Sequence, residues 1–186
     1  MNNLTYASLS KNFEPNKLVL RALEFLKNKD IALDIGAGSL RDSKFLAESG
    51  FKKVIAIDKE NIELSGDRIE FIQTKIQEYV FSKNHFDLVI AINSLPFLNK
   101  KDEFDSVFPK IKDAVKIGGI ICITLFGIND EWAINKKEYM NFHTKEEVLT
   151  LLKDWKIKIF TEEEKQGKTI DGKDKYWHIF RLVAEK

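Results

Sequence analysis

The chain has 186 residues, 44% of them hydrophobic and 32% charged, and its formal net charge is +1. This length can bury one good core and is short for two domains, so we expect a single domain over residues 1–186. Lysines are spread along the whole chain and form no basic block, which argues against a nucleic-acid partner.

Segments with strand and helix patterns alternate along the chain, which is typical of a parallel sheet with helices on both faces. Apolar runs predict strands at 31–35, 53–57, 69–72, 86–92 and 120–126. Apolar residues at helical spacing predict helices at 15–27, 39–49, 102–116 and 144–154.

Several of these predicted helices carry end signals. Ser39 and Asp42 have the spacing of a capping-box start, and Thr144 opens a second capping box. Gly50 should stop the helix at 39–49. The Gly-Gly pair at 118–119 should end the helix before the fifth strand.

Two segments near the C-terminus, 155–160 and 176–184, also alternate polar and apolar residues. The charged connector between them, residues 161–175, is too short for a full crossover helix. We therefore expect the two strands to pair antiparallel at the end of the sheet, joined by a solvated loop.

The single cysteine, Cys122, cannot form an intrachain disulfide, which fits a reducing compartment. It lies in an apolar run and is expected to be a buried small hydrophobe. The N-terminus shows no signal-peptide core, and no apolar stretch is long enough to cross a bilayer. We expect a cytoplasmic, monomeric protein without a membrane partner.

A glycine turn follows the first predicted strand, in Asp34-Ile35-Gly36-Ala37-Gly38, and a helix leaves it. Such a turn uses glycines for positive φ and for close approach of a ligand to the backbone. A dinucleotide fingerprint would have a third glycine where Arg41 stands. Asp34 would repel a pyrophosphate but suits an ammonium group, so the charge favours S-adenosylmethionine over NAD.

Asp58 follows the second predicted strand, where a carboxylate can accept hydrogen bonds from both ribose hydroxyls. This position does not discriminate between the two cofactors, and Asp58 could instead cap a short helix. Together with the strand context and the charge of Asp34, it favours a cofactor site over a plain turn. We include the next residue, Lys59, in that site.

At these residues the chain resembles the class I S-adenosylmethionine-dependent methyltransferases. Residues 32–38 are similar to the first motif of that family, residues 54–58 to its second, and residues 86–93 to its fourth-strand motif. A weaker, narrower resemblance links the chain to the small bacterial tellurite-resistance methyltransferases. The family implies a Rossmann-like, mostly parallel seven-stranded sheet with an antiparallel strand 7.

The resemblance also implies further cofactor residues. Asn93 and Ser94 follow the fourth strand, where methyl transfer takes place in this class, and are expected to line the methionine end. The family usually has an acid near Lys75 that contacts the adenine amino group; a lysine cannot accept that bond. Gln73, Gln77 or the backbone around Lys75 and Ile76 would have to accept that bond instead, and we assign the adenine contact to this segment.

Methyl transfer from a sulfonium is an in-line displacement that needs orientation and exclusion of water, and a general base only if the acceptor arrives protonated. No catalytic triad, metal-spaced His/Cys group or P-loop is present. We expect a methyltransferase for a small-molecule acceptor, with no metal and no assigned catalytic residue. The alternatives are a nicotinamide-dependent Rossmann enzyme and a non-catalytic S-adenosylmethionine-binding module.

Two segments are candidates to cover the acceptor. Residues 1–13 precede the first helix and carry Tyr6, and the long connection at 127–143 carries Trp132 and ends at His143. A lid built from both would enclose a small volume. The alternatives are a frayed terminus and aromatic residues that only close the core.

Overall fold

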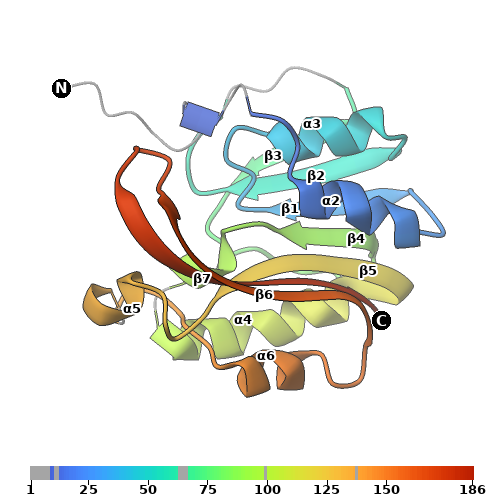
Figure 1. The fold of residues 1–186 in the computed structure, drawn as a ribbon. Helices are drawn as coiled ribbons and strands as arrows, with labels where there is room; N and C mark the ends of the chain where they lie inside the picture. The colour runs from blue at the N-terminus through green and yellow to red at the C-terminus, as the bar shows by residue number, and fades with distance from the viewer. Residues whose placement is uncertain (1–8, 11–12, 63–66, 99, 137) are drawn as a thin grey trace.

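The computed structural model of the protein describes residues 9–10, 13–62, 67–98, 100–136 and 138–186. Seven strands form one sheet in the order β3-β2-β1-β4-β5-β7-β6 (Figure 1). Their bounds are β1 Ile31–Ile35, β2 Lys53–Asp58, β3 Ile69–Gln73, β4 Phe86–Ala91, β5 Val115–Phe126, β6 Lys156–Lys168 and β7 Asp174–Glu185. Strands β1 to β5 pair in parallel, and β7 runs antiparallel to both β5 and β6. The predicted fold class is confirmed.

Helices cover both faces of this sheet, with α2 and α3 on one side and α4 and α6 on the other (Figure 1). Their bounds are α2 Lys17–Ala22, α3 Arg41–Glu48, α4 Lys100–Ala114, α5 Trp132–Asn135 and α6 Lys145–Leu151. Because side chains alternate across a strand, β1 sends Leu33 and Ile35 to the α4 side and Ala32 to the α3 side. The central strand β4 is buried along its whole length.

No helix in the described parts of the chain is long and apolar enough to cross a membrane. Cytoplasmic location and a monomeric state stay predictions. Cys122 is fully buried in β5, and burial raises the pKa of its thiol well above the usual value.

The first helix is shorter than its apolar pattern predicts. It begins at Lys17 because the side chain of Asn16 accepts the backbone N–H of Leu18 and caps it. After Ala22 the chain tightens into the 3₁₀ turn Leu23–Phe25 and then becomes extended.

The capping box expected at Ser39 and Asp42 is wrong, because tertiary contacts take both side chains. The residue before α3 is Leu40, in the left-handed conformation with φ 61°, and no side chain caps the helix. Ser39 accepts a hydrogen bond from Ser10, and Asp42 accepts the backbone N–H of Asn16. By contrast, the capping box at Thr144 is confirmed, as is the stop at Gly50 with φ 99°.

The Gly118-Gly119 pair does not end α4, as the sequence suggested, but lies inside β5. Helix α4 ends at Ala114, and Val115 already pairs with Phe86 of β4. The register then shifts across the glycines, where a Cβ on Gly119 would lie 2.9 Å from Val115 Cγ1. The glycines therefore permit a bulge in a strand and not a helix stop.

The charged connector at 161–175 is a strand pair and not the solvated loop that its composition indicated. Ladder pairing continues from Thr161 opposite Arg181 to Lys168 opposite Asp174. Charged side chains hold the exposed strands together, as in the 2.8 Å bond from Arg181 to Glu163. This hairpin arm, residues 161–175, projects beyond the rest of the sheet (Figure 1).

Candidate active site

The turn between β1 and α3 is fastened to the end of β2 by its own backbone. The N–H groups of Gly36 and Ala37 both donate to the carbonyl of Ile57, at 2.8 and 3.0 Å. Gly36 and Gly38 have φ values of 72° and 54°, which side chains other than glycine rarely adopt. The predicted glycine turn therefore lies at the carboxyl edge of the sheet.

Asp34 stands at the centre of this turn, with 3% of its surface exposed. Its carboxylate accepts a 2.6 Å hydrogen bond from the hydroxyl of Ser43 in α3. Burial, followed by the neighbouring charge of Asp42, raises the pKa of Asp34 to about 7, while Ser43 and Arg41 oppose the shift. The group is set to hold or release a proton near neutral pH.

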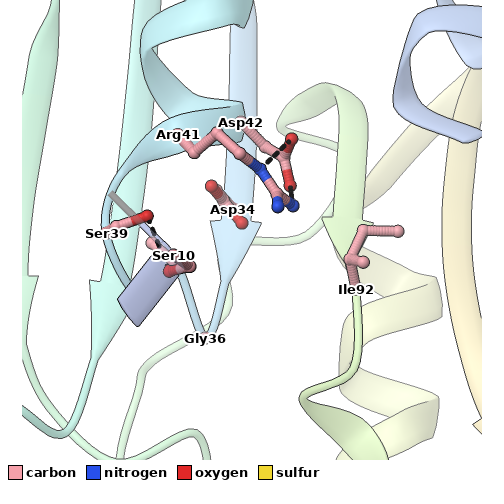
Figure 2. A pocket seen from close by; sticks show the side chains of 8 residues that line it. Ser10, Asp34, Gly36, Ser39, Arg41, Asp42 and Ile92 are labelled. Atoms are coloured by element: carbon pink, nitrogen blue, oxygen red, sulfur yellow. Dashed lines mark hydrogen bonds and ion pairs between the residues drawn. The ribbon is translucent and has the colours of Figure 1, made fainter. Parts of the chain in front are cut away.

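The residues beside Asp34 enclose a small cavity of about 20 Å³ (Figure 2). Arg41 points across it and is paired with Asp42 at 2.7 Å. The cavity is lined by Ser10, Asp34, Gly36, Ala37, Ser39, Arg41, Asp42 and Ile92. Ser10 reaches it from the N-terminal segment, is 1% exposed, and donates to Ser39 at 3.0 Å.

Asp58 organises the turn as well as facing the edge of the sheet. One carboxylate oxygen accepts the N–H of Gly38 and the other the N–H of Glu60, both at 2.9 Å. Lys59 contributes its carbonyl, which accepts a 3.2 Å bond from the Gln73 side chain at the end of β3. Asp58 thus holds the glycine turn against β2 and β3.

Asn93 and Ser94 follow β4 and lie against the glycine turn. Asn93 has φ 53° and is held by Thr124, which accepts its backbone N–H at 2.7 Å and donates to its side chain at 3.0 Å. A Cβ on Gly36 would lie 2.4 Å from the Cβ of Ser94. Gly36 is therefore also required by the close approach of the β4 loop.

The remaining predicted site residues lie in three different places. Lys75 is exposed and pairs with Glu78 at 3.5 Å, and Ile76 packs against the core. His143 is buried, with its ring 4.7 Å from that of Phe104 in α4. Tyr6 lies outside the described residues.

Trp132 belongs to a cluster of rings above the ends of β5 and β7. Its ring centroid lies 6.1 Å from Phe97, 6.0 Å from Phe126 and 5.5 Å from Trp177. We call these four residues the aromatic wall. A lysine from β7, Lys175, is enclosed against it.

Sequence reasoning missed several residues of this region. Ser10, Asp42 and Ile92 line the cavity, and only Asp42 gave any signal, as a helix cap. Lys175 and its partner Asp130 are 45 positions apart, so no local pattern could pair them.

Glu162, Glu164 and His178 are close enough together to suggest a metal site, but their atoms have protein partners. The Asn129 N–H donates to Nδ1 of His178, so Nε2 carries the proton and faces Glu162 at 3.3 Å. Glu162 also pairs with Lys145 at 2.8 Å. The cluster is a hydrogen-bond network between β6 and β7.

Comparison with known families identifies this arrangement. Residues 33–123 match a family model described as a methyltransferase domain. This match covers 91 of the 186 residues, and over that segment the chain is similar to methyltransferase domains. The matched segment begins in β1 and ends in β5, so it contains the glycine turn, Asp58 and the loop after β4. None of the curated proteins matches the chain.

Solved structures share the fold at low sequence identity. An S-adenosylmethionine-dependent methyltransferase from Methanosarcina mazei is 20% identical, with a TM-score of 0.70 over 94% of this chain and 99% of that one. TehB from Haemophilus influenzae is 17% identical, with a TM-score of 0.75 over 97% of this chain and 66% of that one. The 1,6-didemethyltoxoflavin-N1-methyltransferase of Burkholderia thailandensis, solved with 1,6-didemethyltoxoflavin and S-adenosylhomocysteine, is 19% identical, with a TM-score of 0.63 over 91% and 78%.

Proposed function

We propose that this methyltransferase transfers the methyl group of S-adenosylmethionine to a small-molecule acceptor at the carboxyl edge of β1, β4 and β5. The carrying observation is the cavity of about 20 Å³ that the glycine turn lines together with Asp34 and Ser10. Ser10 covers part of this cavity, and a partly covered site favours a small acceptor over a macromolecule. The acceptor of the Burkholderia thailandensis neighbour, 1,6-didemethyltoxoflavin, is a small molecule and fits this proposal.

The cavity suits the ammonium group of the cofactor and not a pyrophosphate. Asp34 and Asp42 contribute carboxylates to its lining. The N–H groups of Gly36, Ala37 and Gly38, which a phosphate would need, already donate to Ile57 and Asp58. The site therefore lacks both the positive charge and the free backbone N–H donors that the pyrophosphate of a nicotinamide cofactor would need.

The cofactor runs, in this proposal, from Asp34 to the end of β3. Asp34 and Arg41 hold the amino acid end, and the backbone of 36–38 lies under the sugar. Asp58 and Lys59 meet the ribose, the segment at 75–76 meets the adenine, and Asn93 with Ser94 faces the methionine end. Asp34 and Asp58 support the assignment, because they stand near the carboxyl ends of the neighbouring parallel strands β1 and β2.

The chain contributes binding, alignment and exclusion of water to the reaction. The lone pair of the acceptor atom attacks the methyl carbon, the carbon–sulfur bond breaks, and its electrons stay on sulfur as S-adenosylhomocysteine forms. An acceptor that arrives protonated gives its proton to water. Ser10 on the cavity and the aromatic wall beside the loop after β4 are the groups proposed to exclude water.

A labelled-methyl experiment tests this proposal. Protein with S-adenosylmethionine carrying a tritiated methyl group is incubated with a panel of small thiols, amines, phenols, carboxylates and metalloid oxyanions. We expect label to appear in at least one acceptor and S-adenosylhomocysteine to accumulate in equal amount. Tight cofactor binding without transfer to any panel member would instead support a non-catalytic binding module.

A further inference from the structure

Lys175 is the most enclosed lysine side chain in the described parts of the chain, 1% exposed. Its ammonium lies 2.6 and 2.7 Å from the two carboxylate oxygens of Asp130, whose side chain is fully buried. Buried charges of this kind need both a counter-charge and hydrogen bonds. Asp130 also accepts the backbone N–H groups of Trp132 and His178, so the carboxylate is fixed from several sides.

Three rings of the aromatic wall surround the same ammonium. Its nitrogen lies 3.5 Å from the ring centre of Trp177, 4.3 Å from that of Trp132 and 5.2 Å from that of Phe126. A cation within about 6 Å of a ring centre is attracted to the ring face. The ion pair therefore fixes two indoles from different segments, one from the connection after β5 and one from β7.

Phe97 joins the wall to the loop after β4. This ring lies 6.1 Å from Trp132 and 6.2 Å from Phe126, and the residue is 50% exposed. Phe97 is one 3₁₀ turn after Ser94, to whose carbonyl its N–H donates at 3.1 Å. Ser94 in turn packs against Gly36 of the glycine turn. Phe97 is thus a half-exposed aromatic residue in the same loop that contacts the glycine turn.

The two buried charges at the wall, those of Lys175 and Asp130, are not available to a ligand. Lys175 and Asp130 neutralise each other and are closed off from solvent. The exposed Lys136 covers the ring of Trp132, with its ammonium 4.0 Å from the ring centre. What the wall offers to a molecule at Phe97 is ring surface.

We propose that the methyl acceptor is a planar aromatic molecule that stacks on Phe97, and that Lys175 and Asp130 are the positioning pair that holds the wall behind it. This inference rests on the proposed function, since a methyl acceptor is expected only if the protein transfers methyl groups. Offset or edge-to-face ring contacts supply the recognition. The pair acts through Trp132 and Trp177 and does not touch the reacting atoms.

The first experiment compares flat and saturated probes of the same polarity. Catechol is paired with cyclohexane-1,2-diol, and 2-naphthol with decahydro-2-naphthol, each titrated into protein saturated with S-adenosylhomocysteine and followed by saturation-transfer NMR. We expect each aromatic probe to bind at least about tenfold more tightly than its saturated partner. Equal binding within a pair overturns the proposal, even where S-adenosylhomocysteine binds and the proposed function stands.

The second experiment tests the positioning pair with the double variant K175M/D130N, which removes both charges and leaves none unpaired. Its matched control is Lys173→Met, which removes an exposed lysine paired with Asp171 in the turn of the same hairpin arm. We expect the double variant to bind S-adenosylhomocysteine within twofold of wild type and to lose about tenfold in affinity for 2-naphthol, with no change in the control. A parallel loss of both ligands, or of neither, refutes the positioning role.

Discussion

Position 36 requires glycine for two separate reasons. Its φ of 72° is strained for any side chain, and a Cβ would lie 2.4 Å from that of Ser94. Gly36→Ala should lower the free energy of unfolding by more than the roughly 1–2 kcal/mol of a left-handed alanine, because the β4 loop must also move. Cofactor affinity should fall with it, as urea unfolding and calorimetry with S-adenosylhomocysteine will measure.

Gly172→Ala provides the control for this substitution. Gly172 has a φ of 83° and nothing within 4 Å of its Cβ position, so only the backbone strain applies. The control variant should lose about 1–2 kcal/mol and keep its cofactor affinity. Equal losses in the two variants would show that contact with Ser94 adds nothing.

Asp34 should make both stability and cofactor binding depend on pH. Because its folded pKa of about 7 lies above the unfolded value of 3.8, the stability it contributes is fully present below about pH 4 and is lost as pH rises through 7. Binding of the cofactor ammonium needs the carboxylate, so affinity should rise over the same range. It should fall again only well above about pH 8, because the carboxylate beside the ligand amino group makes that ammonium less acidic than a chain terminus.

Calorimetry with S-adenosylhomocysteine between pH 5.5 and 9 checks this dependence. Affinity at pH 6 should be about tenfold weaker than at pH 7.5, which corresponds to one proton on a group of pKa about 7. The variant Asp34→Asn should bind S-adenosylhomocysteine weakly, and its affinity should not fall between pH 7.5 and pH 6. A flat profile in the wild-type protein would remove Asp34 from the ammonium site.

Asp58 should contribute to binding both directly and through the glycine turn. Asp58→Ala removes the acceptor for Gly38 and Glu60, together with the proposed bonds to the ribose hydroxyls. We expect cofactor binding to weaken by about 1–3 kcal/mol while the circular dichroism spectrum is retained. An unchanged dissociation constant would place the ribose elsewhere.

Among the elements, the segment before α2 contributes to the cavity without belonging to the sheet. Ser10 lines the cavity and donates to Ser39, and the backbone of Asn16 is held by Asp42 in α3. Deleting residues 1–13 should leave the melting temperature of the cofactor-free protein nearly unchanged, because the sheet and α2 lie outside it. Turnover should fall, with at most a moderate loss of cofactor affinity.

The variant Ser10→Ala removes the hydrogen bond to Ser39 and leaves the rest of the N-terminal segment in place. Loss of this one hydrogen bond should destabilise the docked segment by about 0.5–1.5 kcal/mol. Turnover should therefore fall much less than on deletion of the whole segment. Full activity of the truncated protein in the labelled-methyl assay would show that the segment is no lid.

For the whole molecule, cofactor binding should appear as thermal stabilisation. A ligand that binds only the folded state at 100 times its dissociation constant adds about 2.7 kcal/mol, which for a chain of this size raises the melting temperature by roughly 5–11 °C. S-adenosylmethionine and S-adenosylhomocysteine should both give this shift in scanning fluorimetry. NAD at the same concentration should give none, and a shift with NAD alone would contradict the cofactor assignment.

The sequence determined the order of strands and helices because apolar periodicity is a local signal. It identified β1 to β4 within two residues and the capping box at Thr144, where the partners are three positions apart. It also placed Asp34, the glycine turn and Asp58 at one site, since the carboxyl ends of neighbouring parallel strands meet at one edge of a sheet.

The tertiary structure decided the features that depend on distant partners. Ser39 and Asp42 lost their capping role to Ser10 and Asn16, 29 and 26 positions away. Most of the charged connector became strand because residues 161–168 find ladder partners at 174–181 of β7. Lys175 became a buried ion with Asp130 and the aromatic wall, because desolvation of a charge is tolerated only where the fold brings a counter-charge to it.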